Sequence, residues 1–173
     1  MAPVTLVLGG ARSGKSRHAE RLVRESGRAR LYIATGRAWD DEMRQRIKQH
    51  QRDRGPEWRT IEAPEALEDA IGENGDPNIA VLVDCLTLWV TNLMMADEDV
   101  AERSKRLVSA VRASSATIVL VSNEVGLGIV PENAMARAFR DHAGRLHQLI
   151  AEAADNVHFV AAGLALTLKG TEC

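Results

Sequence analysis

The residues best suited to chemistry lie near the start of the chain, in the segment Gly-Gly-Ala-Arg-Ser-Gly-Lys-Ser at positions 9–16. This segment satisfies G-x-x-x-x-G-K-[ST], the pattern of a phosphate-binding loop (P-loop) whose backbone N–H groups surround phosphate oxygens. Lys15 is predicted to reach the terminal phosphates as a catalytic residue, and the Ser16 hydroxyl to hold Mg²⁺. The predicted nucleotide contacts in the loop are Gly9, Gly10, Ala11, Arg12, Ser13, Gly14, Lys15 and Ser16.

A second candidate ligand for Mg²⁺ ends an apolar run farther along the chain. Residues 79–83 read Ile-Ala-Val-Leu-Val, and Asp84 follows them. In a P-loop protein, a buried strand that ends in a carboxylate is the expected form of the strand whose Asp binds the magnesium ion. We therefore expect Asp84 to serve the metal, directly or through water.

Two other predicted strands also end at polar residues. Residues 31–34 end at Thr35, and residues 58–61 are followed by Glu62. Strand ends form the ligand crevice of an open α/β sheet, so Thr35 is a candidate site residue. A turn that merely ends the strand explains Thr35 equally well.

His50 lies in a segment, residues 40–54, in which acidic residues lead and basic residues follow, as suits a helix macrodipole. A single histidine on a helix is usually structural or exposed, and a basic run is usually a solvated face. The alternative is that its arginine neighbours act on phosphates in a protein that already binds them. The residue pattern leaves both interpretations open. The neighbours are Arg46, Arg52 and Arg54.

Strand and helix patterns alternate along the rest of the chain. We expect an α/β fold of one domain over residues 1–173, with a mostly parallel sheet covered by helices on both faces. The glycine-containing segment 123–131 is expected to be a binding loop, and Gly163 to begin a tail after the last strand. The predicted strands are 4–8, 31–34, 58–61, 79–84, 117–122 and 157–161, and the helices are 16–25, 40–54, 64–71, 85–95, 100–112 and 133–154.

Composition narrows the classes of partner. The chain has 173 residues, 27% of them charged, and a net charge of −2, which argues against nucleic-acid or membrane-surface binding. Its two cysteines cannot form a disulfide framework, and Cys85 reads as a buried thiol. There is neither an apolar run of membrane-span length nor a signal-peptide pattern, so we expect a cytoplasmic protein.

Some expectations concern single side chains. His18 is expected to be exposed, and His142, His147 and His158 to be surface or packing residues. The apolar helix 85–95 offers more apolar surface than one helix on a small sheet needs to bury, which predicts a closed homo-oligomer. The apolar residues at issue are Trp89, Val90, Leu93, Met94 and Met95. The loop after residue 122 carries no Asn-Lys-x-Asp motif, which argues against a regulatory GTPase.

Taken together, these segments resemble one family. The segments that carry the resemblance are residues 9–17, Tyr-Ile-Ala-Thr at 32–35, Asp-Glu-Met at 41–43, Arg-Ile at 46–47 with His50 and Arg54, Trp-Arg-Thr at 58–60, Leu-Thr-Leu-Trp-Val-Thr-Asn-Leu at 86–93 and Ser-Asn-Glu-Val-Gly-Leu-Gly-Ile-Val-Pro at 122–131. They are similar to the bifunctional adenosylcobinamide kinase/adenosylcobinamide-phosphate guanylyltransferases, from the first strand to Lys169. Ala165 departs from a proline that is frequent in the family, and some members carry Glu at the position of Asp84.

The resemblance implies a RecA-like sheet, a homotrimer and two reactions. A nucleoside triphosphate, ATP or GTP with Mg²⁺, phosphorylates adenosylcobinamide. GMP then passes from GTP to an enzyme histidine, which falls on His50, and from there to adenosylcobinamide phosphate. The implied nucleotide contacts are residues 9–16, Ala34, Thr35, Gly36, Gln51, Arg52, Asp53, Arg54, Glu62 and Asp84.

Two other function classes remain open at this point. One is a plain small-molecule kinase in which His50 is inert. The other is a non-enzymatic nucleotide switch, whose GTP turnover would depend on a partner protein.

Overall fold

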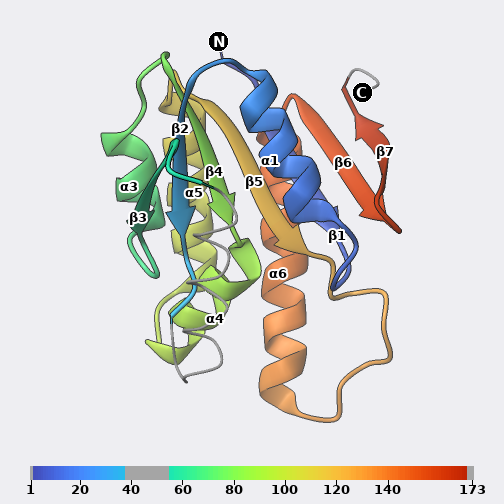
Figure 1. Cartoon of the computed structure of the whole chain (residues 1–173). Helices are drawn as coiled ribbons and strands as arrows, with labels where there is room; N and C mark the ends of the chain where they lie inside the picture. Colours follow the sequence, from blue (N-terminus) through green and yellow to red (C-terminus); the bar gives the residue numbers. More distant parts are fainter. Residues whose placement is uncertain (1, 38–54, 171–173) are drawn as a thin grey trace.

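The computed structural model describes residues 2–37 and 55–170. Seven strands form one sheet in the order β3-β2-β4-β5-β1-β6-β7 (Figure 1). The strands are β1 (Val4–Gly9), β2 (Ala29–Ala34), β3 (Trp58–Glu62), β4 (Ile79–Asp84), β5 (Thr117–Asn123), β6 (Asn156–Ala161) and β7 (Leu164–Lys169). The helices are α1 (Lys15–Glu25), α3 (Leu67–Glu73), α4 (Leu86–Met95), α5 (Val100–Ala113) and α6 (Ala134–Ala153).

The sheet is parallel from β3 to β6, and only β7 runs antiparallel to its neighbour. Strand β1 is flanked by β5 and β6, so its apolar residues are buried on both faces. Leu6 packs into one hydrophobic cluster and Val7 into the other, as alternation along a strand requires. The expected mostly parallel α/β sheet is confirmed.

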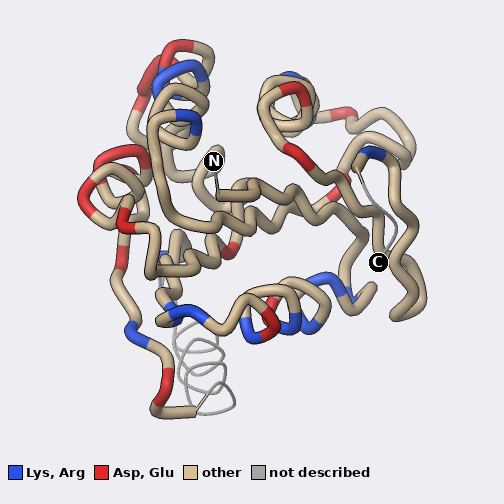
Figure 2. The backbone as a smooth tube through the Cα atoms, turned by 90° about the horizontal axis from the view of Figure 1, so that it is seen from above, with Lys and Arg blue, Asp and Glu red and all other residues tan. Residues whose placement is uncertain are grey.

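The two faces of the sheet are covered unequally (Figures 1 and 2). Among the described helices, α1 lies on one face, where Ala19 and Val23 join a cluster with strand residues such as Val121. Helices α3, α4, α5 and α6 lie on the other face and share a larger cluster with strand residues such as Leu120. All parallel strands end at the same edge of the sheet, which is where the loop after β1 meets the start of α1.

Helix α4 corrects the reasoning behind the predicted oligomer. Trp89, Val90 and Leu93 are fully buried in the larger cluster of this same chain, and the Trp89 Nε1 donates to the Glu65 carbonyl at 2.8 Å. Only Met95 of the five apolar residues is exposed, at 58%. The apolar surface of this helix is needed for the core, so it does not indicate a subunit contact.

Helix α3 begins at Leu67, three residues later than the predicted start at Pro64. Side chains from the neighbouring helices hold the intervening backbone. Asn92 Nδ2 donates to the Pro64 carbonyl at 2.8 Å, and Arg103 donates to the Glu65 carbonyl at 2.7 Å. These tertiary bonds take carbonyls that a helix would have used.

Strand β7 was not predicted, because the residues after Gly163 were assigned to a tail. A two-residue turn joins it to β6, with Ala162 at φ 52° and Gly163 at φ 79°. Both values lie in the left-handed region that tight hairpin turns of this kind require. The alternation Leu-Ala-Leu-Thr-Leu of residues 164–168 is typical of an edge strand.

Candidate functional site

The predicted phosphate-binding loop connects β1 to α1 at the carboxyl edge of the sheet. Gly14 has φ 96°, which favours glycine, and it directly precedes the helix. A Cβ at Gly9 would lie 2.5 Å from both Ser13 Oγ and the Val160 carbonyl oxygen, so no side chain fits there. The glycines therefore allow the tight backbone path that the motif requires.

The polar groups of the loop lie around its backbone. Lys15 is only 9% exposed, and its Nζ donates to the Gly10 carbonyl at 3.2 Å, so its cation is held within the loop. Ser13 Oγ is buried and has no hydrogen-bond partner among the described residues. Ser16 stands at the positive end of α1. An ammonium, a hydroxyl without a partner and a helix N-terminus suit phosphate oxygens.

Three other predicted contacts lie side by side at the same edge. Ala34 is the register partner of Glu62 on β3 and of Asp84 on β4. Tyr32 Oη donates to Asp84 Oδ2 at 3.2 Å; Tyr32 packs in the cluster beneath α1, so this carboxylate lies on the α1 face of the sheet. Strand β5 separates β4 from β1, which puts Asp84 about 10 Å across the sheet from the P-loop strand. The sheet thus brings the ends of β1 to β4 to a single edge.

Thr35 lies inside the fold. Its side chain is fully buried, donating to the Cys85 carbonyl at 2.7 Å and accepting from the Cys85 N–H at 2.8 Å. Its own carbonyl accepts from Asn92 at 2.7 Å. These hydrogen bonds account for a threonine at this position without any contact to a ligand. Gly36, the next residue, is partly exposed. Cys85 is buried as predicted, and burial, followed by the Asp84 charge, raises the pKa of its thiol.

The predicted histidine nucleophile and the contacts next to it lie outside the described residues. They are His50, Gln51, Arg52, Asp53 and Arg54, together with the neighbouring Arg46. Their roles remain predictions.

The donor set suits a magnesium ion brought by a nucleotide. Within residues 2–37 and 55–170, no three His, Cys, Asp or Glu side chains cluster to hold a metal by themselves. Mg²⁺ commonly uses one or two protein oxygens together with substrate phosphates and water. Ser16 Oγ and the Asp84 carboxylate are oxygens of that kind.

Strand β5 extends to Asn123, the first residue of the segment 123–131 that the sequence predicts to be a binding loop. Asn123 is the register partner of Gly9, and its Nδ2 donates to Thr87 Oγ1 at 3.0 Å. Ser122 Oγ is 2.7 Å from His147 Nε2, and burial lowers the pKa of that histidine. Only the strand order shows that Asn123 lies beside the P-loop strand, because the residues that it and Ser122 contact are distant in sequence.

His18 was expected to be exposed, and the structure corrects this. It is 8% exposed, and its Nε2 is 2.9 Å from Nδ1 of His158, which is itself buried on β6. The pKa of His18 is lowered by burial and then by the charges of His158 and Arg21. The two rings meet edge to face, joining α1 to the sheet.

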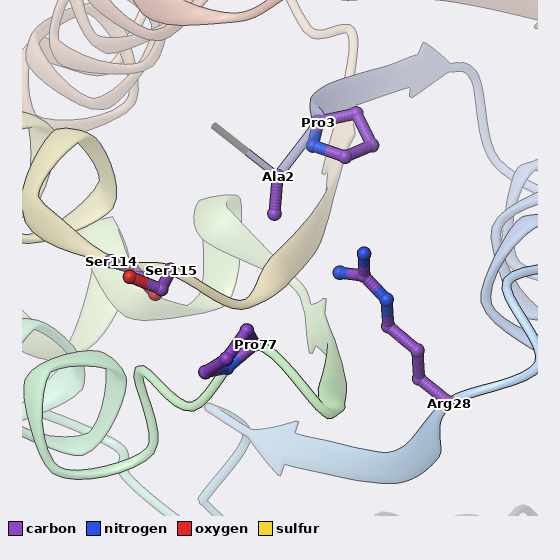
Figure 3. A pocket seen from close by; sticks show the side chains of 6 residues that line it. All are labelled: Ala2, Pro3, Arg28, Pro77, Ser114 and Ser115. Carbon is purple, nitrogen blue, oxygen red and sulfur yellow. The ribbon is translucent and has the colours of Figure 1, made fainter.

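A separate hollow lies at the opposite edge of the sheet (Figure 3). It measures about 360 Å³ and is lined by Ala2, Pro3, Arg28, Pro77, Ser114 and Ser115, all near strand beginnings. Its position separates it from the nucleotide loop.

No helix in the described residues has the length and apolar character to cross a membrane.

Known structures share the fold. The structure resembles the RadB recombinase with a TM-score of 0.53 and 16% sequence identity, covering 91% of this chain and 74% of that protein. It also resembles the P4 protein of bacteriophage phi6, in complex with ADP, with a TM-score of 0.51 and 19% identity, covering 95% and 54%. These similarities show a RecA-like α/β fold.

Sequence comparison gives the family. The model of the cobinamide kinase/cobinamide phosphate guanyltransferase family matches residues 5–168. A Pseudomonas aeruginosa protein named bifunctional adenosylcobalamin biosynthesis protein CobP is 48% identical over 167 residues, covering 95% of this chain and 96% of the relative. The Escherichia coli protein named bifunctional adenosylcobalamin biosynthesis protein CobU is 44% identical over 179 residues, covering 95% and 98%. The chain therefore belongs to the cobinamide kinase/cobinamide phosphate guanyltransferase family.

Proposed function

We propose that this protein is a bifunctional enzyme of cobalamin biosynthesis. It phosphorylates adenosylcobinamide with ATP or GTP, and it then transfers GMP from GTP to adenosylcobinamide phosphate. The observation that carries the proposal is a P-loop with its lysine in place, in a chain that matches the family over residues 5–168. The predicted contacts at the ends of β2, β3 and β4 support a nucleotide that extends from the loop along this edge.

The kinase reaction depends on position and charge. The substrate hydroxyl attacks the γ-phosphorus, and the bond to the bridging oxygen breaks. Lys15 and the loop N–H groups hold the phosphate oxygens on which charge develops. Ser16 and Asp84 would hold Mg²⁺, which supplies further charge neutralisation.

Guanylyl transfer needs a nucleophile, for which we propose His50. A neutral imidazole nitrogen attacks the α-phosphorus of GTP, a P–N bond forms, and pyrophosphate leaves. The phosphate oxygen of adenosylcobinamide phosphate then attacks the same phosphorus and the P–N bond breaks, which returns the free histidine. The arginines adjacent in sequence, Arg52 and Arg54, would disfavour protonation of the ring and stabilise the departing charge.

The decisive experiment measures both activities on one preparation of His50→Ala. Guanylyl transfer should be lost, as should the acid-labile adduct formed with labelled GTP, while much of the kinase activity remains. Arg59→Ala on β3 is a control for loss of an exposed side chain outside the predicted contacts.

The other outcomes separate the alternatives. Retained guanylyl transfer would exclude His50 as the nucleophile. Equal loss of both activities in a folded variant would mean that His50 positions the nucleotide. The absence of an adduct in the unmodified protein would favour a plain kinase, and GTP turnover only with a partner protein would favour a switch.

We also propose a cytoplasmic homotrimer. The trimer rests on the family resemblance, and the cytoplasmic location on the cysteine usage. Leu164, Leu166 and Leu168 alternate along β7 and are 76%, 61% and 57% exposed, which supports a second copy of the chain as the cover of this strand. Sedimentation should give a trimer for the unmodified protein and a smaller species for Leu166→Lys. A monomer at micromolar concentration of the unmodified protein would contradict the proposal.

A further inference from the structure

A cleft of about 470 Å³ lies beside the P-loop, between α1 and the turn that joins β6 to β7. Its lining residues are Gly14, Arg17, His18, Arg21, Gly163, Leu164 and Ala165. Figure 1 shows α1 and the β6–β7 hairpin next to each other at this end of the sheet. The cleft is therefore formed by the first helix together with the last two strands.

The lining of the cleft is cationic. Arg17 and Arg21 are one helical turn apart on α1, and no lining residue carries a carboxylate. Arg21 Nε is 3.9 Å from Glu25 Oε1, one turn farther along the helix, where both side chains are exposed. Figure 2 shows Lys and Arg gathered along α1, on its own side of the sheet. A group that enters the cleft meets positive charge.

Hydrogen bonds through two buried histidine rings orient the guanidinium of Arg21. Arg21 Nη2 is 3.2 Å from His18 Nδ1, and a guanidinium can only donate, so Nδ1 accepts. The proton of the neutral His18 ring is then on Nε2, which donates to His158 Nδ1 at 2.9 Å. Because both rings are buried, this chain of hydrogen bonds holds Arg21 at the mouth of the cleft before any ligand arrives.

The opposite wall is attached to the P-loop itself. Gly163 N donates to the Ser13 carbonyl at 2.8 Å. A Cβ on Gly14 would come within 3.1 Å of Gly163 Cα, so hairpin and loop are in close approach. Leu164 and Ala165 add an apolar side to the same wall. Two guanidinium groups and an apolar wall suit an amphipathic ligand with an anionic end.

The cleft lies on the side of the loop away from the predicted nucleotide contacts. Those contacts lie at the ends of β2, β3 and β4, whereas the cleft lies toward β6 and β7, and β1 separates the two groups in the sheet. A nucleotide that extends from the P-loop toward Glu62 would leave the cleft free for another ligand.

We propose that this cleft binds the phosphate group of a second substrate, with Arg17 and Arg21 as its donors. The inference rests on the proposed function, which requires the enzyme to bind a phosphorylated acceptor as well as a nucleotide. Arginine is suited to this role because its planar N–H groups pair with two phosphate oxygens at once. The same chemistry is found in adenosylcobinamide phosphate and in the polyphosphate of a second nucleotide.

The test is a set of calorimetric titrations on protein already saturated with GDP and Mg²⁺, so that the P-loop is filled. The titrants are adenosylcobinamide phosphate, adenosylcobinamide, ATP and inorganic pyrophosphate. In Arg17→Gln/Arg21→Gln, binding of the phosphorylated titrant should weaken by about tenfold or more, the scale of losing hydrogen bonds to a charged group. Arg24→Gln, on the same helix but outside the cleft, should change binding less than about twofold, as expected for an exposed charge.

The titrants identify the source of the phosphate. A loss confined to adenosylcobinamide phosphate, with unphosphorylated adenosylcobinamide unaffected, assigns the cleft to the acceptor. A loss confined to ATP assigns it to a second nucleotide. Unchanged affinity for all phosphorylated titrants in the double variant would overturn the proposal.

Failure of the proposed function gives a different result. If the unmodified protein did not bind GDP or transfer GMP, the two reactions would be excluded. Pyrophosphate binding would still show whether the two arginines hold phosphate.

Discussion

The two faces of the sheet use the same strands for different purposes. Beneath α3, α4, α5 and α6, the residues that β5 contributes to the core, Ile118 and Leu120, are fully buried and apolar. The buried ion pair on this side, Arg103 Nε to Glu68 Oε1 at 2.6 Å, joins α5 to α3, away from the sheet edge. Arg103 also donates to the Glu65 carbonyl at 2.7 Å, so this pair ties helix α5 to α3 and the segment before it.

Both faces bury polar groups. On the face covered by α4 and α6, Ser122 is 2.7 Å from His147 Nε2, and Asn92 donates to the Thr35 carbonyl.

The face beneath α1 buries a different set. Lys15, His18 and His158 are each less than a tenth exposed, and Asp84 accepts from Tyr32 on the same side. Most of these groups lie at or near the P-loop. We infer that stability comes mainly from the thick side, the face covered by α3, α4, α5 and α6. Binding and chemistry come mainly from the thin side, the face that α1 covers among the described helices. Substitutions on each face test this separation.

The largest expected effect is that of Lys15→Ala. Both activities should fall by about 100-fold or more, the scale of losing one donor to transition-state charge. Steady-state rates and urea unfolding on the same preparations test this, and the unfolding midpoint should change little. Lys105→Ala, an exposed lysine of α5, is the matched control. Near-normal rates in Lys15→Ala would contradict the assignment of the loop.

Leu120→Ala is the opposite experiment on the thick side. Truncating this fully buried leucine should cost about 2–5 kcal/mol of unfolding free energy, through lost burial and the cavity left behind. GDP affinity at low temperature, where the variant is folded, should stay near normal. Leu127→Ala, at an 81% exposed leucine, should leave the unfolding free energy nearly unchanged. A loss of GDP affinity in folded Leu120→Ala would mean that the two faces are coupled.

Acid should destabilise the fold in part through the two buried histidines beneath α1. Burial lowers the pKa of His18 and of His158 in the folded state, so the unfolded chain binds protons that the folded chain does not. Their contribution to stability is complete above the ordinary histidine pKa of about 6.5 and is lost as the pH falls toward the folded values. Urea midpoints between pH 7.5 and 5 should therefore decline.

Replacing both rings separates this effect from general acid destabilisation. His18→Phe/His158→Leu should flatten the decline, with a remainder from His147, whose pKa burial also lowers. His142→Gln, at a half-buried histidine of α6, is the matched control. An unchanged slope in the double variant would exclude the pair as the source.

The smallest expected effect concerns a helix cap on the thick side. Asp99 accepts from the Glu102 N–H at 3.0 Å at the start of α5. Asp99→Ala should lower the unfolding free energy by about 1 kcal/mol with normal activities, and Asp99→Asn should retain most of the stability. A fall in kcat in Asp99→Ala would argue against the separation of the two faces.

Local patterns were sufficient for much of this molecule. The strands beneath the core are apolar runs that end in turn residues, so β4 was predicted with its observed bounds. The P-loop was recognisable because its chemistry needs glycines and a lysine at fixed spacing. The convergence of Ala34, Glu62 and Asp84 also follows, since parallel strands end at one edge.

What local patterns missed depends on partners distant in sequence. His18 and His158 are 140 residues apart, and nothing near His18 indicates that a second ring covers it. The apolar surface of helix α4 could not be assigned locally either, because α5, α6 and strand β5 cover it. The start of α3 was displaced by bonds from Asn92 and Arg103 that no local propensity encodes. The roles of all the predicted site residues, His50 among them, remain predictions.

The hydrogen bond between the β6–β7 hairpin and the P-loop affects the order in which the chain can fold during synthesis. A ribosome produces β1 and its loop first, but β1 pairs with β5 and β6, and the loop is held through Gly163. The native neighbours of the nucleotide loop are therefore complete only after residue 163 has been synthesised. Such long sequence separation slows folding and leaves a nascent chain dependent on late contacts. We therefore expect a nascent chain to bind nucleotide only after the β6–β7 hairpin has been synthesised.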